Sequence, residues 1–177
     1  MKLIVLDRDG VVNEDSDAYI KHPDEWHPVP GSLEAIAKLK QAGWTVAVAT
    51  NQSGVRRGYY SRETLHAMHM KFVALLAEQD AEVDWISYSP YVAEDDSPCR
   101  KPGTGMLQAI ENRFGVSLAG QPMVGDTLAD IAVAKAKGMT PYLVKTGKGP
   151  RTLATQDPLL SGVPVYDNLL TVVEVLL

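Results

Sequence analysis

The chain has 177 residues, and 17 Lys and Arg residues against 22 Asp and Glu residues give it a net charge of −5. The hydrophobic share of 45% excludes a disordered or fibrous protein, and the acidic balance argues against a nucleic-acid partner. A single cysteine excludes a disulfide framework, and no apolar run approaches the roughly 20 residues that span a bilayer. Since no signal peptide is recognisable, we expect one monomeric, cytoplasmic domain over residues 1–177 with no membrane partner.

Short apolar runs alternate along the chain with longer segments whose apolar residues recur every three to four positions. The runs predict buried strands, and the longer segments predict helices. In chain order, we expect a strand at 3–6, a helix capped by Ser32 and ended by Gly43, a strand at 46–49, a helix beginning at Ser61, a strand at 85–88, a helix from Thr104 to Gly115, a strand at 122–124, a helix at 128–137, a strand at 141–144, an edge strand at 163–166 and a last helix at 169–176.

This alternation of strand and helix predicts an α/β fold. Right-handed βαβ units of this kind build a doubly wound, mostly parallel sheet. Ligands of such sheets bind beyond the carboxyl ends of the strands. The side chains that directly follow each apolar run are therefore the candidate functional residues.

Acidic and polar side chains do follow these runs. Asp7 and Asp9 come after the first strand, Thr50 ends the second, Lys101 precedes the third helix, and Asp126 follows the fourth strand. Each feature alone is common in turns, but together they form an ordered set at one edge of the sheet. Buried carboxylates need a partner, and Mg²⁺ prefers such hard oxygen ligands. We therefore expect a Mg²⁺ site that binds a phosphate.

These segments resemble the four motifs of the haloacid dehalogenase superfamily phosphatases. The resemblance spans about residues 2–148 and is carried by Asp7-Arg8-Asp9-Gly10, Thr50, Lys101 and Gly125-Asp126-Thr127-Leu128-Ala129-Asp130. It implies a Rossmann-like sheet of the haloacid dehalogenase type. Only 40 residues separate Asp9 from Thr50 and 50 separate Thr50 from Lys101, so neither gap holds a folded cap domain.

The resemblance also implies a role for each motif residue. Asp7 would be the nucleophile that forms an aspartyl-phosphate, and Asp9 would protonate the leaving alkoxide and later take a proton from water. Thr50 would donate its hydroxyl to the phosphoryl group, and Lys101 would supply a positive charge. Asp7, the backbone carbonyl of Asp9 and the side chain of Asp126 would bind Mg²⁺.

Within the superfamily, the sequence is most similar to phosphatases of heptose bisphosphate and of histidinol phosphate. The closer match lies in 7–13, in 50–54 with Arg57 and Gly58, and in 99–107. It implies removal of the C7 phosphate of D-glycero-D-manno-heptose 1,7-bisphosphate, a step towards lipopolysaccharide, with histidinol phosphate as the alternative substrate. The side chains expected to contact the sugar phosphate are Asp15, Asn51, Gln52, Ser53, Arg57 and Arg100.

One loop departs from that family. Its usual zinc ligands, Cys-x-His and Cys-x-Cys, are replaced by Ser89-Pro90-Tyr91 and Ser97-Pro98-Cys99. One cysteine does not hold a structural zinc ion, so none is expected. Since the loop has changed, a catalytically silent sugar-phosphate-binding protein stays open as a non-enzyme alternative.

Two smaller signals have plain interpretations. His66 and His69 lie three residues apart on a predicted helix, and a surface pair is favoured over a metal site because no third ligand is evident. The Gly147-Lys148-Gly149 segment suggests a phosphate loop, but the rest of that motif is absent.

Overall fold

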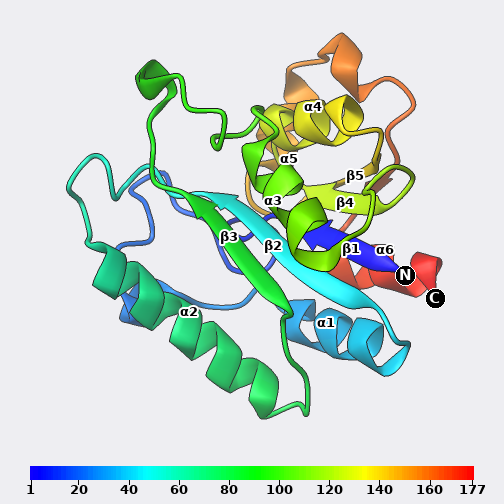
Figure 1. The fold of residues 1–177 in the computed structure, drawn as a ribbon, viewed down its shortest axis with the longest axis horizontal. Helices are drawn as coiled ribbons and strands as arrows, with labels where there is room; N and C mark the ends of the chain where they lie inside the picture. The colour runs from blue at the N-terminus through cyan, green and yellow to red at the C-terminus, as the bar shows by residue number, and fades with distance from the viewer.

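A computed structural model describes all residues, 1–177, and its centre is one six-stranded sheet (Figure 1). Every neighbouring pair of strands is parallel, and the strand order is β3-β2-β1-β4-β5-β6. The strands are β1 (Leu3–Leu6), β2 (Thr45–Asn51), β3 (Trp85–Ser89), β4 (Pro122–Gly125), β5 (Thr140–Val144) and β6 (Val165–Tyr166). The predicted α/β class and doubly wound sheet are confirmed. In this order β1 lies between β2 and β4, so the loops after these three strands meet at one edge.

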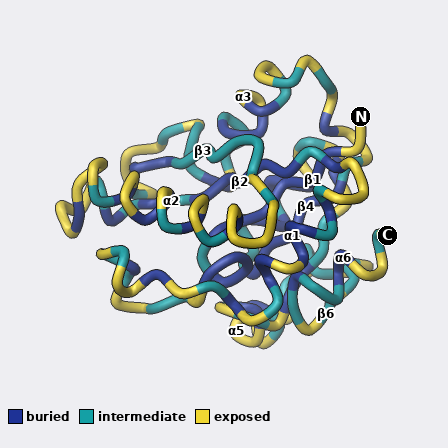
Figure 2. Tube along the Cα trace, turned by 90° about the horizontal axis from the view of Figure 1, so that it is seen from below, coloured by how far each residue is buried: buried dark blue, intermediate teal, exposed yellow.

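Helices cover both faces of the sheet. They are α1 (Ser32–Gln41), α2 (Arg62–Ala77), α3 (Gly105–Phe114), α4 (Leu128–Ala136), α5 (Gly149–Ala154) and α6 (Leu169–Leu176). The side chains of β1 alternate between two cores: Ile4 and Leu6 pack with α1, α2 and α6, whereas Leu3 and Val5 pack with α3 and α4. Burial on both faces explains the uninterrupted apolar runs of β1, β2 and β4, which lie in the buried centre of the molecule (Figure 2).

The helix starts show where local sequence decides the structure and where it does not. Ser61 caps α2 as predicted, since its Oγ accepts from the N–H of Thr64 at 3.1 Å. The predicted cap of α1 is wrong: Gly31 occupies the cap position, and Ser32 lies inside the helix. The buried Ser32 hydroxyl instead donates to the carbonyl oxygen of Val11 at 2.7 Å. A tertiary hydrogen bond has replaced the local one.

The loops at the carboxyl edge contain only short helical turns. Between β1 and α1 there is one 3-10 turn, Pro23–Glu25, and between β3 and α3 there is another, Ala93–Asp95. A third turn, Pro158–Leu160, and the short helix α5 also lie outside the elements expected from the sequence. None of the helices combines the length and the apolar composition that a membrane span requires.

The interpretation of His66 and His69 as a surface pair is wrong. His66 is exposed, but His69 is buried, with 6% of its surface accessible, because α2 turns this side chain towards the loop after β1. There its Nε2 lies 3.2 Å from Nη1 of Arg8.

Candidate active site

Asp7 is the first residue after β1 and is buried at the carboxyl edge of the sheet. Its N–H donates to the carbonyl oxygen of Val124 in β4, which fixes the backbone. Its Oδ1 accepts from the N–H of Arg8 at 2.7 Å and lies 3.1 Å from Nζ of Lys101. Its Oδ2 receives no hydrogen bond from the protein. One carboxylate oxygen is therefore anchored, and the other is available for chemistry.

Lys101 is 3% exposed and places its ammonium group at the centre of the site. Its Nζ lies within hydrogen-bond distance of Asp7, of Asp130 at 2.6 Å and of the carbonyl oxygen of Ala49 at 2.8 Å. Burial lowers the pKa of Lys101, but the two carboxylates outweigh this effect and raise it above its ordinary value. The lysine therefore stays charged. Asn51 fixes its backbone from β2, by hydrogen bonds to both the N–H and the carbonyl oxygen of Lys101.

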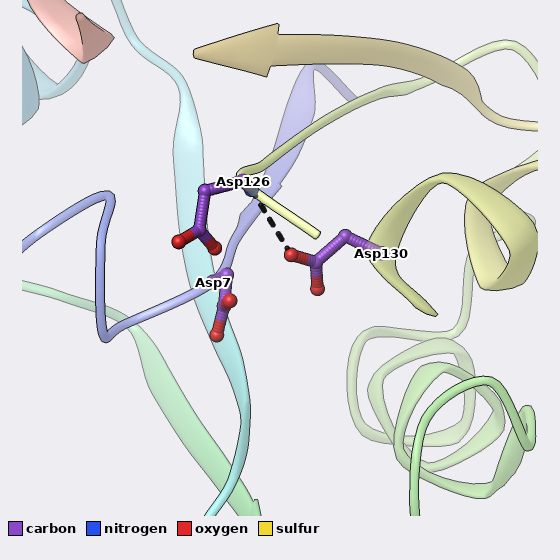
Figure 3. A group of neighbouring side chains, drawn as sticks. All are labelled: Asp7, Asp126 and Asp130. Atoms are coloured by element: carbon purple, nitrogen blue, oxygen red, sulfur yellow. Dashed lines mark hydrogen bonds between the residues drawn. The ribbon is translucent and has the colours of Figure 1, made fainter. Parts of the chain in front are cut away.

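Three carboxylates converge where β1 meets β4. One oxygen from each of Asp7, Asp126 and Asp130 lies within 4.8 Å of the others. Figure 3 shows the three side chains grouped together. The Oδ1 atom of Asp126 is buried and has no hydrogen-bond partner. Burial, and then the charge of Asp130, raise the pKa of Asp126 to about 7, and burial with the neighbouring carboxylates also raises the pKa of Asp7. An unpaired buried carboxylate beside a second one fits a divalent cation held by Asp7 and Asp126.

Asp130 was noted in the sequence without a role of its own, and the structure gives it one. It lies in the first turn of α4, and its Oδ2 accepts from Thr127 and from the N–H of Asp126 at 3.1 Å (Figure 3). Its Oδ1 accepts from Lys101. Burial raises the pKa of Asp130, but the lysine charge and these donors lower it overall, so the carboxylate is ionised. Both oxygens are occupied, and Asp130 therefore positions Lys101 and Asp126. The sequence pattern that could have indicated this role is the capping box formed by Thr127 and Asp130, three residues apart.

Asp9 is held at the edge of the same site by three neighbouring side chains. Its Oδ1 accepts from Arg8 at 2.7 Å and from Asn13 at 2.9 Å, and its Oδ2 accepts from Gln52 at 2.8 Å. Burial raises its pKa, but the charge of Arg8 and these hydrogen bonds lower it below the ordinary value. Asp9 is therefore ionised in this arrangement, and about a quarter of its side chain remains accessible.

Arg8 explains why Asp9 is so well defined. The Arg8 side chain is fully buried, and it donates to Asp9 and contacts Nε2 of His69. Burial and the adjacent guanidinium lower the pKa of His69 to about 3, so the ring is neutral. Since arginine only donates, Nε2 is the accepting nitrogen. The sequence alone did not reveal this contact, because it joins residues 61 positions apart.

The carboxylates open into a cavity of about 360 Å³. Five of the six side chains expected to contact a substrate line it: Asp15, Asn51, Gln52, Ser53 and Arg100. The sixth, Arg57, is exposed on the turn after β2 and does not line the cavity. Thr50 is buried beneath the lining, and its Oγ1 accepts from Gln52 at 2.9 Å. The motif residues Asp7, Asp9, Lys101 and Asp126 all face this cavity.

A further lysine in the cavity lining was missed. Lys148, set aside in the sequence as part of an incomplete phosphate loop, donates its N–H to Oδ2 of Asp126 at 2.8 Å. This close approach needs Gly147, where a Cβ would lie 2.3 Å from Gly10 and 2.4 Å from Asp126. The glycines of this segment therefore allow two loops to meet.

The chain is similar to known phosphatases along nearly its whole length. It is 54% identical to the D-glycero-beta-D-manno-heptose-1,7-bisphosphate 7-phosphatase of Pseudomonas aeruginosa, over 99% of this chain and 97% of that protein. It is 52% identical to the protein of the same name from Pseudomonas putida, over the full length of both chains. A family model described as HAD-hydrolase-like also matches residues 98–172.

Solved structures agree with these relatives. The D,D-heptose 1,7-bisphosphate phosphatase of Bordetella bronchiseptica, which was crystallised with magnesium and phosphate, superposes with a TM-score of 0.96 at 52% identity, over 99% of this chain and 98% of that one. The corresponding phosphatase of Burkholderia thailandensis superposes with a TM-score of 0.76 at 40% identity, over 99% and 98% of the two chains.

Proposed function

The chain belongs to the heptose bisphosphate phosphatases of the haloacid dehalogenase superfamily, and we propose that it is a Mg²⁺-dependent phosphomonoesterase that removes the C7 phosphate of D-glycero-D-manno-heptose 1,7-bisphosphate. The observation that carries this proposal is the asymmetry of Asp7. Its Oδ1 is held by Arg8 and Lys101, whereas its Oδ2 has no donor. A nucleophilic carboxylate needs one such free oxygen.

The first half of the reaction follows from this geometry. Asp7 attacks phosphorus, the bond between phosphorus and the sugar oxygen breaks, and the alkoxide takes a proton from Asp9. The negative charge of the arriving phosphate favours the protonated form of Asp9, which is ionised before substrate binds. Lys101 lies beside the attacking carboxylate and balances charge on the phosphoryl group, because catalysis of phosphoryl transfer is mainly positioning and charge neutralisation. Bound Mg²⁺ adds further positive charge between Asp7 and Asp126.

The second half releases the phosphate. Asp9 takes a proton from water, which attacks phosphorus and frees the carboxylate of Asp7. The hydrogen bonds from Arg8, Asn13 and Gln52 hold Asp9 in the ionised form that this step needs. One water is consumed and inorganic phosphate leaves; the sugar, which keeps its C1 phosphate, was the leaving group of the first half.

We also propose that residues 1–177 act as one monomeric cytoplasmic domain on a small sugar phosphate. The acidic composition supports the absence of a nucleic-acid partner, and the two cores share one sheet. Asp15, Asn51, Gln52, Ser53, Arg57 and Arg100 are the proposed substrate contacts. Asn51 also positions Lys101, because its side-chain amide forms hydrogen bonds with the backbone N–H and carbonyl oxygen of Lys101. Five of these side chains line the cavity, and Arg57 lies on the exposed turn after β2.

The test is kcat/KM for both anomers of heptose 1,7-bisphosphate, histidinol phosphate, fructose 1,6-bisphosphate and an aryl phosphate. We expect a preference of about tenfold or more, roughly 1.4 kcal/mol, for one heptose anomer. A preference for histidinol phosphate would replace the substrate assignment. Asp7→Asn should abolish all turnover, and Asp9→Asn should slow it by roughly 10²–10⁴-fold. If the wild-type protein binds these compounds without hydrolysing any of them, it is the silent binding protein.

A further inference from the structure

The two carboxylate oxygens of Asp9 have different surroundings. Oδ1 accepts from three donors, which are Nε and Nη2 of Arg8 at 3.3 and 2.7 Å and Nδ2 of Asn13 at 2.9 Å. Oδ2 accepts from one donor, Nε2 of Gln52 at 2.8 Å. Arg8 and Asn13 are fully buried and do not line the cavity, whereas Gln52 does. Oδ2 is therefore the oxygen that remains free to exchange a proton with a group in the cavity.

Arg8 is a cation that does not reach the substrate. Its side chain has no accessible surface and is not part of the cavity lining. Its backbone is fixed, because its N–H donates to Asp7 at 2.7 Å and its carbonyl oxygen accepts from the N–H groups of residues 11–13. The guanidinium group therefore acts on the reaction only through a neighbour that faces the cavity, and that neighbour is Asp9.

His69 completes the contacts of this guanidinium group. Nη1 of Arg8 lies 3.2 Å from Nε2 of His69, which α2 supplies from 61 positions further along the chain. With Nε and Nη2 at Asp9, each nitrogen of the planar group then has a partner. A buried donor without an acceptor is costly, so His69 restricts the guanidinium group to this one orientation.

Gln52 holds the other oxygen of Asp9 and is itself held by Tyr60. Its Oε1 accepts from the Tyr60 hydroxyl at 2.6 Å, so its amide NH₂ group faces Asp9 at 2.8 Å and Thr50 at 2.9 Å. The orientation of Asp9 is thus fixed from two directions, from α2 through Arg8 and from the turn after β2 through Gln52.

We propose that Arg8 and His69 are positioning residues for proton transfer. His69 orients the Arg8 guanidinium, which occupies Oδ1 of Asp9 and so leaves Oδ2 as the oxygen that exchanges the proton. In the first half of the reaction, the O–H bond at Oδ2 breaks together with the bond between phosphorus and the leaving oxygen, and that oxygen takes the proton. In the second half, Oδ2 takes a proton from the attacking water. The inference rests on the proposed function, because it concerns the acid and base of that reaction.

This role predicts a dependence on the leaving group. A sugar alkoxide or a phenolate needs a proton as it leaves, whereas 2,4-dinitrophenolate is stable enough to leave without one. The value of kcat/KM reports only the steps up to departure of the leaving group, so it isolates the first half of the reaction. Impaired proton transfer therefore lowers kcat/KM for phenyl phosphate much more than for 2,4-dinitrophenyl phosphate, while a general loss of structure lowers both equally.

The experiment compares His69→Leu with the matched variant His66→Leu. Both positions lie on α2, but His66 is exposed and does not line the cavity. We expect His69→Leu to lower kcat/KM for phenyl phosphate about tenfold more than for 2,4-dinitrophenyl phosphate, and His66→Leu to keep the wild-type ratio. His69→Gln, which restores a neutral acceptor, should recover most of the ratio. Equal losses on both esters in His69→Leu would overturn the proposal and leave the contact a structural role only.

Arg8→Lys tests the guanidinium group while the buried positive charge is kept. An ammonium group is a point charge and does not bridge Asp9 and His69 as the planar fork does, so the ratio should change by about tenfold or more. Urea unfolding establishes that the variant is folded. A wild-type ratio in folded Arg8→Lys would contradict the proposed role of the fork. If this variant does not fold, His69→Leu and His69→Gln still decide.

A double variant shows whether His69 acts through Asp9. Asp9→Asn removes the proton that is to be positioned, so adding His69→Leu to it should cause no further loss of kcat/KM for phenyl phosphate. If the two losses multiply, His69 acts by another route and the proposal is wrong.

The aryl esters also separate this inference from the substrate assignment. If the wild-type protein hydrolyses these esters but not heptose 1,7-bisphosphate, the substrate assignment fails and the ratios still decide the roles of Arg8 and His69. If it hydrolyses the heptose compound and the ratio is unchanged in His69→Leu and Arg8→Lys, the assignment stands and the inference fails.

Discussion

The ammonium nitrogen of Lys101 lies closer to Asp130, at 2.6 Å, than to the nucleophile Asp7, at 3.1 Å. The residue that lies nearest to this ammonium group is thus one that does not line the cavity. Asp130 also accepts from the N–H of Asp126 and so links the lysine to the metal site. Asp130 therefore holds both the catalytic lysine and the backbone of the proposed metal ligand Asp126.

Asp130→Asn tests this role. The amide keeps the shape but removes the charge that holds a buried ammonium, so we expect a loss of about 3 kcal/mol in the free energy of unfolding. Because Lys101 and Asp126 then lose their orientation, kcat/KM should fall by roughly 10²-fold. Urea unfolding and steady-state kinetics measure the two effects. Glu34→Gln, which removes an exposed pair with Lys38, should change stability by less than about 0.5 kcal/mol. Unchanged kinetics in Asp130→Asn would contradict the assignment.

Metal removal should make stability depend on pH in a particular direction. The pKa of Asp126 is raised to about 7 in the folded protein from an ordinary 3.8, so its contribution to stability is full below about pH 4 and is lost as the pH rises towards 7. Mg²⁺ competes with these protons and should stabilise the protein more at about pH 8 than at about pH 5.5. Thermal unfolding with Mg²⁺ and with EDTA checks this. Asp126→Asn should remove most of the difference; an equal Mg²⁺ shift at both pH values would refute the site.

His69 should have the opposite effect on stability. Its pKa is lowered to about 3 from an ordinary 6.5, so the unfolded chain takes up a proton before the folded protein does, and stability falls as the pH drops below 6.5. Between about pH 7 and pH 5 the loss is on the order of 2 kcal/mol. His69→Gln keeps a neutral acceptor for Arg8 and should flatten this part of the profile. His66→Gln, on the exposed face of α2, should follow the wild-type protein in urea unfolding.

The metal content is a separate prediction. Protein purified without chelator should bind Mg²⁺ at Asp7, Asp9 and Asp126, and should contain no stoichiometric zinc. The reason is that Cys99 is the only cysteine in the loop that carries zinc ligands in related phosphatases. Elemental analysis measures both metals, and one zinc per chain would overturn the expectation.

Much of this architecture follows from short-range patterns. Strand positions were predictable because burial on both sheet faces requires apolar side chains at every position, as in Leu3–Leu6. Strand order then brings the residues after β1 and β4 together. The convergence of Asp7, Lys101 and Asp126 on one cavity was therefore expected from the sequence.

What could not be predicted depends on contacts between distant residues. Ser32 satisfies its hydroxyl at Val11 and not at its own helix, and nothing local distinguishes the two outcomes. His69 is buried against Arg8 and accepts a hydrogen bond from it. The three-residue spacing of His66 and His69 on α2 is equally compatible with an exposed pair. Lys148 reaches the cavity only because two glycine loops touch. In each case the position of the side chain depends on a residue that is distant in the sequence.

The contact between Gly10 and Gly147 constrains how this enzyme can diversify. A Cβ at Gly10 would lie 2.0 Å from Asp126, and one at Gly147 would overlap Gly10, so side chains are sterically excluded from both positions. The loops after β1, β4 and β5 are interlocked there, and an insertion in one would displace the others. New substrate preferences must therefore arise further out, in the segments around Asp15 and Arg100. The contact between these glycines thus separates the part of the site that performs the reaction from the part that contacts the sugar.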